Sequence, residues 1–409
     1  MRILFYLPIV TPFWFENLLP PIIRRAAREA EVHIIVPLSW KETGILGPQL
    51  QRWLDLPQIR WHILDGPDHP SFRIAPERPQ ELIDFVQAID PDYTFCRSAD
   101  IVTPAQFPGQ VRYLMEGDYP PLLGDGRPHS ERIMVTDAGI LDHGMMPPLD
   151  PGQHDWLAAQ MAPLWREYQA RHGSFPGGAA AYRAAAGLPA DRKVLAVPLE
   201  SESATNFFYE AHCALTQSDQ FIADLAARID DDMMLAVTPH PLWLWQVPEV
   251  RDTIAARLQR IATMNPDKVR LVLQPGNPTQ LTRWLIQYSD GVIVRDSKTL
   301  TMGAFHGKPC LRLSPFACGE WMRVYRDIAA FQDDVRSDTA RTARLADTLA
   351  WFGFHHANQA FLPGDYEQTF RMLLDRVDRP VDPCRWEASL DLHREDFADW
   401  FDEPLQRVA

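Results

Sequence analysis

Short apolar runs alternate along the chain with amphipathic stretches. In the first third, such runs predict buried strands at 2–8, 32–38, 59–64, 92–97 and 111–116. Apolar residues recur at helical spacing in 18–30 and 76–89, which predicts helices between these strands. Strand and helix in alternation indicate a parallel sheet with helices on both of its faces.

The second half of the chain repeats the alternation more regularly. Strands are predicted at 193–200, 233–239, 269–274, 291–296 and 308–314. Helices are predicted at 218–229, 251–264, 277–290 and 297–307, the last with Ser297 as its N-cap and Gly307 after its end. The predicted fold class is therefore α/β, with two Rossmann-like, doubly wound units that face a cleft.

The region between the two halves has a different composition. Residues 117–132 and 142–153 are rich in Gly and Pro and predict loops, and 156–173 predicts an amphipathic helix. A chain of 409 residues also exceeds the usual size of one hydrophobic core. We expect an N-terminal Rossmann-like domain over 1–185, a C-terminal Rossmann-like domain over 186–370, and a helical segment over 371–409 that could cross back to the first domain.

The composition is that of an ordinary globular protein, with 46% hydrophobic and 23% charged residues. Forty Lys and Arg against 54 Asp and Glu give a net charge of −14, which disfavours nucleic acid as a partner. The five cysteines are scattered without CxxC spacing, so neither a zinc site nor a disulfide framework is indicated. No stretch approaches the ~18 apolar residues of a membrane span. We expect a cytoplasmic protein, either free or at the inner face of the inner membrane.

A histidine lies between two prolines at the end of one predicted strand, in "LAVTPHPLW". Ligands of open α/β sheets bind beyond the carboxyl ends of the strands. Pro239 and Pro241 restrict the backbone on either side of His240, so its ring could be held toward a phosphate as a hydrogen-bond donor. A turn histidine that faces solvent is the alternative.

The stretch "VIVRDSKTLTMGAFHGKP" predicts a strand, a tight turn and a helix. Ser297 and Thr299 would lie at the helix N-terminus, where unpaired N–H groups and the helix dipole attract anions, and Lys298 adds a full positive charge. The alternative is that Ser297 only caps its helix. No GxGxxG and no GxxxxGK[ST] is present, so dinucleotide redox chemistry and P-loop phosphoryl transfer lack support.

Acidic residues follow a predicted strand of the first half, in "LMEGDYPP" and "VTDAGILDHG". Glu116 or Asp118 would face the cleft, and Asp137, Asp142 and His143 lie in the neighbouring loop. A transferase needs a general base to deprotonate an acceptor hydroxyl. We select Glu116 as that base, with Asp137 in reserve. A solvated loop charge is the alternative for each.

In their order and spacing, these motifs resemble the capsule polysaccharide biosynthesis and export family, whose transferase members have the GT-B fold and include Kdo transferases. The matching stretches are "YLMEGDYPP", "IMVTDAGILDHGMMP", "VPLESESATNF", "VTPHPLW" and "VRDSKTLTMGAFHGKP". The resemblance implies a metal-independent glycosyltransferase that needs no cofactor. It would move a sugar from a nucleotide-sugar donor, with CMP-Kdo favoured, to a growing bacterial surface or capsular polysaccharide or a glycolipid.

The resemblance also implies roles for individual residues. His240 and Ser297 would bind the donor phosphate, and Glu116 matches the carboxylate that serves as the base. Family members carry a Glu about five residues before the Gly of "GKP", where this chain has Met302. That departure leaves UDP-, dTDP- or GDP-sugars open as donors, with Glu200 or Glu202 as substitutes in donor binding.

Two other functional classes remain open. A hydrolysing nucleotide-sugar epimerase uses the same double α/β architecture, but it forms its product without an acceptor. A non-catalytic polysaccharide-assembly protein could use the same scaffold, and its nucleotide binding would be absent or independent of His240. Association with a membrane surface or with an assembly complex also remains open. The acidic run 230–232 precedes a strand, at the wrong end of a sheet for catalysis, and is not predicted to bind a metal.

Overall fold

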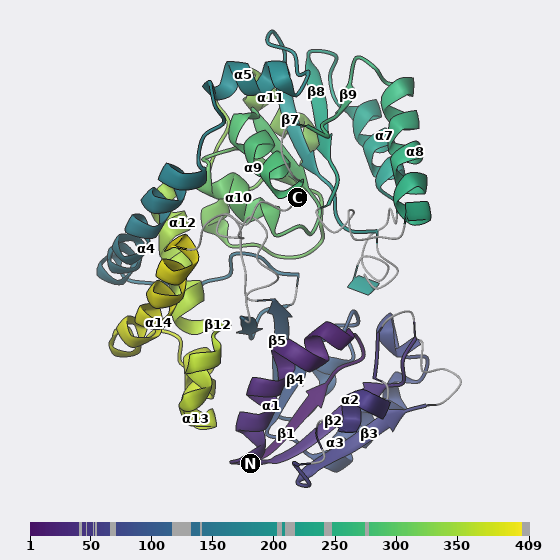
Figure 1. Ribbon diagram of the computed structural model, residues 1–409, viewed down its shortest axis with the longest axis vertical. Helices are drawn as coiled ribbons and strands as arrows, with labels where there is room; N and C mark the ends of the chain where they lie inside the picture. The colour runs from purple at the N-terminus through teal and green to yellow at the C-terminus, as the bar shows by residue number, and fades with distance from the viewer. Residues whose placement is uncertain are drawn as a thin grey trace.

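The structure is a computed structural model and describes residues 1–40, 43–45, 47–51, 53, 55–65, 71–116, 132–139, 141–202, 207–208, 217–240, 248–274 and 278–402. Two sheets form two lobes, with β1 to β5 in the lower lobe of Figure 1 and β7 to β9 in the upper lobe. The predicted α/β class is confirmed, because each lobe has helices on both faces of a mainly parallel sheet. Two Rossmann-like units arranged in this way form the GT-B architecture.

The first sheet has the strand order β12-β6-β5-β4-β1-β2-β3. Its strands are β1 (Arg2–Tyr6), β2 (Glu31–Pro37), β3 (Ile59–Leu64), β4 (Tyr93–Cys96), β5 (Gln110–Glu116), β6 (Ile133–Thr136) and β12 (Ala360–Phe361). The strands from β1 to β5 pair in parallel, as predicted. At the other edge lie two strands that the sequence analysis did not predict: β6 runs antiparallel to β5, and β12 antiparallel to β6.

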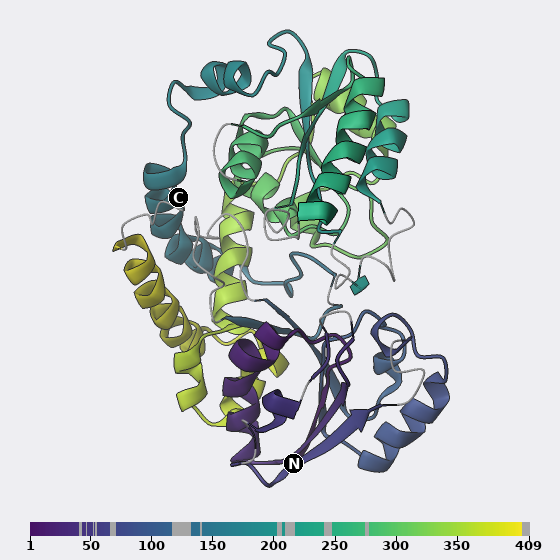
Figure 2. The same ribbon diagram turned by 45° about the vertical axis from the view of Figure 1, so that its right-hand side comes forward.

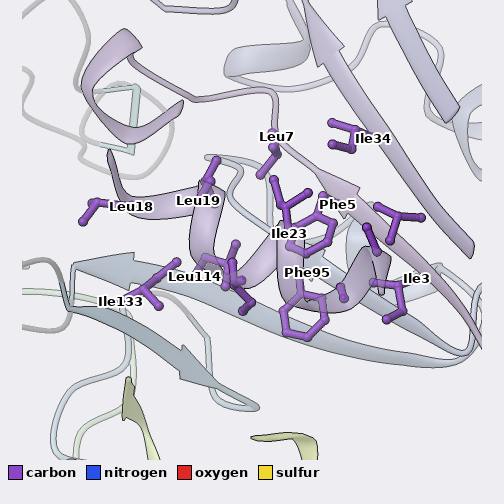
Figure 3. Packing of buried hydrophobic residues seen from close by; sticks show 14 of the residues in the cluster. Ile3, Phe5, Leu7, Leu18, Leu19, Ile23, Ile34, Phe95, Leu114 and Ile133 are labelled. Atoms are coloured by element: carbon purple, nitrogen blue, oxygen red, sulfur yellow. The ribbon is translucent and has the colours of Figure 1, made fainter. Parts of the chain in front are cut away.

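Helices cover both faces of the first sheet. They include α1 (Leu19–Ala27), α2 (Gly47–Gln51) and α3 (Pro79–Ile89), with short turns of helix at η1 (Trp14–Leu18), η2 (Ser71–Arg73) and η3 (Pro104–Gln106). Successive residues of β1 point to opposite faces. Phe5 packs with Ile23 of α1 and Phe95 of β4, as Figure 3 shows, whereas Leu4 packs with Val86 of α3. Because both faces are covered, β1 is an uninterrupted apolar run.

The second sheet has the order β11-β10-β7-β8-β9, with every neighbouring pair parallel. Its strands are β7 (Lys193–Pro198), β8 (Met233–Thr238), β9 (Val269–Leu271), β10 (Gly291–Val294) and β11 (Cys310–Arg312). One face is covered by α7 (Ser218–Arg228), α8 (Pro248–Met264) and α11 (Ile328–Arg336), and the other by α9 (Pro278–Tyr288) and α10 (Thr299–Phe305). The strand order reverses between β7 and β10, and such a reversal opens a crevice at the carboxyl ends of those strands.

Further helices connect the two units. They are α4 (Pro151–His172), α5 (Gly178–Ala185), α12 (Leu345–Asn358), α13 (Phe370–Asp378) and α14 (Pro383–Asp402), with short turns at η5 (Glu320–Met322) and η6 (Pro363–Glu367). Figures 1 and 2 show α4, α12 and α14 side by side along one flank, and α12 contacts both of the others. The prediction that the loop 142–153 extends to residue 153 is wrong, because α4 begins at Pro151, where a capping box at Asp150 stabilises its first turn.

The C-terminal part of the chain returns to the first unit. Phe361, Phe370 and Leu373 lie in the same core cluster as β1 and α1. A buried ion pair, Arg376 Nη1 to Asp365 Oδ1 at 2.6 Å, fixes α13 against η6. The predicted domain boundaries at 185 and 370 stay a prediction. Within the described part of the chain, no helix combines the length and the apolar character needed to cross a membrane.

Candidate functional site

Predicted site residues from the two units meet at the carboxyl ends of the strands. Glu116 is the last residue of β5 in the first sheet, and Lys298 follows β10 in the second. Lys298 Nζ donates a hydrogen bond to the backbone carbonyl oxygen of Glu116 at 2.8 Å and lies 3.7 Å from Glu116 Oε2. The candidate base and a candidate phosphate-binding cation are therefore in direct contact.

The Glu116 carboxylate is held by two donors of its own unit. Glu116 Oε1 accepts a hydrogen bond from Arg97 Nη2 at 3.1 Å and another from Trp14 Nε1 at 2.9 Å. The Arg97 guanidinium lies 3.7 Å from the centre of the Trp14 ring, a cation–π contact. The sequence analysis missed both residues. A signal existed for Arg97, which ends the predicted strand 92–97 at the same edge of the sheet.

These charges set the protonation state of Glu116. Its partial burial by itself raises the pKa, but the nearby charges of Arg97 and Lys298 outweigh this effect and lower the pKa to about 2. The carboxylate is therefore ionised at neutral pH and a weak base in this arrangement. Its role as the catalytic base stays a prediction.

Glu200 holds the loop that carries Ser297 and Lys298. Its Oε1 accepts a hydrogen bond from the backbone N–H of Asp296 at 2.6 Å, and its Oε2 lies 3.3 Å from Arg295 Nη2. Burial raises the pKa of Glu200 even though Arg295 acts in the opposite direction. The carboxylate thus occupies an N–H group of the turn that was predicted to bind an anion.

The same loop is fixed from the other side by residues that precede α4. His143 Nε2 donates to the carbonyl oxygen of Asp296 at 2.8 Å, and Asp142 Oδ1 accepts from the N–H of Ala317 at 2.9 Å. Arg312 is buried and donates to the carbonyl oxygen of Leu141 at 2.6 Å. Burial, reinforced by the charge of Arg312, lowers the pKa of His143 to about 3. Asp142 and His143 therefore form hydrogen bonds that connect the two units, and they are not solvated loop residues.

Ser297 and Thr299 bond to each other. The N–H and the hydroxyl of Thr299 both donate to Ser297 Oγ, at 3.2 and 2.8 Å. The described helix begins at Thr299, and Lys298 before it already has helical geometry. Ser297 Oγ accepts the N–H two residues on, which is the N-cap bond that was predicted. Gly307 follows the helix with a positive φ of 60°, as predicted.

His240 and Glu202 lie in a small pocket beside the crevice. The pocket is lined by Leu199, Glu200, Ser201, Glu202, Ser218, Pro239, His240, Ile254 and Leu258. Burial lowers the pKa of His240 to about 4, so its ring is neutral at pH 7. Glu202 accepts from the N–H of Ser218, the first residue of α7, and from Arg257 Nη2, both at 2.7 Å. Its carboxylate therefore serves the N-terminus of α7.

An apolar cavity of about 300 Å³ adjoins this pocket and shares Pro239 and Leu258 with it. Among the described residues that line it, which include Leu271 and Leu273, Gln259 has the one polar side chain. A flat apolar group in this cavity would lie next to His240.

The remaining predicted residues are placed as follows. Asp137, the reserve base, is exposed in the turn after β6, and Met302 is buried in the core under α10. Pro241 and Asp118 lie outside the described residues. Where the chain is described, no cluster of three or more His, Cys, Asp or Glu side chains could hold a metal ion. The acidic run 230–232 is paired with Arg336, whose Nε lies 2.8 Å from Asp232 Oδ2.

No protein-family model matches the sequence, and no curated protein matches it either. Solved structures with a similar shape include the Thermosulfurimonas dismutans KpsC, a beta Kdo 2,7 transferase, at 11% identity and a TM-score of 0.39, covering 78% of this chain and 88% of that one. A Burkholderia vietnamiensis α,α-trehalose-phosphate synthase (UDP-forming) has 14% identity, a TM-score of 0.35 and coverage of 97% and 82%. The UDP-GlcNAc 2-epimerase of Neisseria meningitidis has 13% identity, a TM-score of 0.22 and coverage of 98% and 100%. These proteins differ in activity and their TM-scores are low, so the fold assignment rests on the sheet topology.

Proposed function

We propose that the protein is a glycosyltransferase that moves a sugar from a nucleotide-sugar donor to a growing bacterial surface or capsular polysaccharide or a glycolipid. The contact of Glu116 with Lys298 supports this proposal most. It joins a carboxylate of one unit to a cation of the other at the reversal of strand order, where α/β sheets bind ligands. A transferase needs both groups there, one for the acceptor hydroxyl and one for the donor phosphate.

In the proposed reaction each group has one task. Glu116 takes the proton of the acceptor hydroxyl, and the acceptor oxygen bonds to the anomeric carbon of the donor sugar. The bond from that carbon to the donor phosphate breaks, and its electron pair passes to the phosphate oxygen. Lys298 and the neutral ring of His240 stabilise the growing negative charge, with the hydroxyls of Ser297 and Thr299 beside them. No metal ion or other cofactor enters this scheme.

Two adjoining pockets support a position for the donor nucleotide. We place the phosphate and ribose at the His240 pocket and the nucleobase in the apolar cavity near Gln259. The motif resemblance favours CMP-Kdo, and UDP-, dTDP- and GDP-sugars are the alternatives. The reaction would take place in the cytoplasm, either in solution or at the inner face of the inner membrane.

The other two classes have less support. A hydrolysing epimerase needs free carboxylates around the sugar, whereas Glu200 and Glu202 are bound to N–H and guanidinium groups of the protein itself. A non-catalytic assembly protein gives no reason for an ionised carboxylate to face a lysine across the crevice.

A thermal-shift panel with CMP, CDP, UDP, dTDP and GDP tests the proposal. A ligand that binds only the folded protein adds about 2.7 kcal/mol of stability at one hundred times its Kd. We expect one nucleotide to raise the Tm of the native protein, with a smaller rise in His240→Ala. His154→Ala is the matched control, because His154 lies on α4 and pairs with Asp347 of α12, away from the strand ends.

Two outcomes would count against this assignment. If no nucleotide raises the Tm of the native protein, the nucleotide-sugar donor is wrong. If a nucleotide raises the Tm equally in His240→Ala and in the native protein, the role of His240 is wrong and the assembly-protein alternative gains support.

A further inference from the structure

Glu116 directs its two carboxylate oxygens to different units. Oε1 is bonded to Arg97 and Trp14, both of the first unit. Oε2 is turned toward Lys298 of the second unit. The first unit therefore fixes the position of the side chain through one oxygen and leaves the other to face the crevice.

The contact between Oε2 and Lys298 is electrostatic. At 3.7 Å the two atoms lie beyond hydrogen-bond distance, while the ammonium gives a short bond to the Glu116 carbonyl oxygen instead. A lysine ammonium has three donors on a flexible stem, so it can turn to a new acceptor without moving the backbone. A phosphate beside Lys298 would offer more charge and better hydrogen bonds than Oε2 does.

Resting on the proposed function, we propose that Glu116 and the donor phosphate compete for Lys298, so that donor binding draws the ammonium away and activates the carboxylate as the base. Before the donor binds, Glu116 stands in for the phosphate as the counter-charge of Lys298. After it binds, Arg97 and Trp14 still hold Oε1, and Oε2 can take the proton of the acceptor hydroxyl.

The electrostatics of the site agree with this exchange. Two cations lower the pKa of Glu116, and withdrawal of one of them raises it toward the ordinary range. The carboxylate would then be a stronger base only when a donor is present. Transfer would follow an order, with the donor bound before the acceptor is deprotonated, and an acceptor alone would meet an inactive base.

The test is the affinity for CMP, CDP, UDP, dTDP and GDP, by titration calorimetry on the full chain. Glu116→Gln removes the competing charge but keeps an acceptor oxygen for Arg97 and Trp14, so nucleotide binding should become tighter by roughly three- to tenfold. Lys298→Gln should weaken binding roughly tenfold. In the double variant, the gain in nucleotide affinity from Glu116→Gln should disappear, because the Lys298 ammonium, for which the two anions compete, is absent.

Glu31→Gln is the matched control. Glu31 also pairs with arginines, Arg2 and Arg60, but it begins β2 and so lies at the opposite end of the same sheet. Its nucleotide affinity should equal that of the native protein. If Glu116→Gln does not fold, Glu116→Asp serves instead, because the shorter side chain keeps its charge but withdraws from Lys298; it too should bind nucleotide more tightly.

The outcomes separate this inference from the function on which it rests. Nucleotide binding by the native protein with equal or weaker binding by Glu116→Gln overturns the competition and leaves the glycosyltransferase proposal standing. A gain that persists in the double variant also overturns it, because the effect would then not pass through Lys298. Absence of nucleotide binding by the native protein overturns both.

Discussion

Glu116 and Glu200 lie at strand ends on opposite sides of the site, and their pKa values move in opposite directions. Glu116 has 35% of its side-chain surface exposed and faces two cations, which lower its pKa to about 2. Glu200 has 12% exposed and faces one, Arg295, with the Asp296 carboxylate nearby, and its burial raises the pKa. The number of cationic partners, set against burial, decides the direction of each shift.

The difference indicates different tasks. Glu116 is a fixed negative charge that faces the other unit, and its contacts suit an exchange of partners. Glu200 is bonded to a backbone N–H, and a carboxyl oxygen accepts that bond whether or not the group is ionised. We therefore expect substitutions around Glu116 to act through charge, and substitutions at Glu200 to act through the hydrogen bond that it makes.

The largest effect should come from Arg97→Met. This change removes the main partner of Glu116 and the stack on Trp14, and it leaves a partly buried carboxylate with one cation. We expect the free energy of unfolding to fall by about 2 to 3 kcal/mol, less than for a fully buried pair because Glu116 is one third exposed. Urea unfolding at pH 7 measures it.

Arg60→Met is the control for that variant. Arg60 pairs with Glu31 at 2.9 Å but is 65% exposed, so its loss should change stability by no more than about 0.5 kcal/mol. Equal effects of the two substitutions would show that Arg97 does not anchor Glu116.

The next effect is a pH dependence of stability that comes from His143, which is hydrogen-bonded between the two units. The folded-state pKa of His143 is lowered to about 3, so below the unfolded-state value of about 6.5 the unfolded chain takes up a proton that the folded protein does not. Stability should therefore fall as the pH drops from 7.5 to 5.5, by about 1.4 kcal/mol for this histidine. His240, with a pKa of about 4, acts with the same sign.

His143→Gln tests that contribution, since an amide can donate to the Asp296 carbonyl oxygen without titrating. Its free energy of unfolding should decrease by about 1.4 kcal/mol less than that of the native protein between these two pH values. Glu116 contributes little in this range, because its stabilising charge is lost only as the pH falls toward 2. An identical pH dependence in the variant would mean that His143 is not neutral in the folded protein.

The smallest effect should be that of Glu200→Gln. The amide oxygen can still accept from the N–H of Asp296, so the free energy of unfolding at pH 7 should change by no more than about 1 kcal/mol. Because the folded-state pKa of Glu200 is raised, its contribution is complete below the unfolded-state pKa and is lost as the pH rises through the folded-state pKa. The native protein should therefore exceed the variant in stability by more at pH 5 than at pH 8, and the reverse order would contradict the raised pKa.

Much of the fold follows from local pattern. The long apolar runs that became β1, β2, β7 and β8 were predictable because strands buried on both faces leave an uninterrupted signal. β12 was not, because two residues are too few to show a period. The pairing of β12 with β6 also joins residues far apart in the chain, which no local pattern reports.

The candidate site was predictable to a similar depth. Because both residues follow the carboxyl ends of strands, Glu116 and Lys298 were predicted to face the same crevice, and they are in contact in the structure. The contacts of Glu202 could not be foreseen, because its partners Ser218 and Arg257 come from later elements that meet it only after folding. Trp14 was missed for the same reason. Residue positions follow from topology, whereas hydrogen-bond partners depend on tertiary packing.

The return of the chain to the first sheet sets the order in which the protein can be completed during synthesis. Every strand of the second sheet has left the ribosome once Arg312 has, whereas the first sheet waits for Ala360 and Phe361 to form its edge. Phe370 and Leu373, which cover part of the first core, emerge later still. Domains generally finish folding in the order in which they are made. Here the unit that is begun first is finished last, and apolar surface of the nascent first unit stays uncovered while the second unit folds.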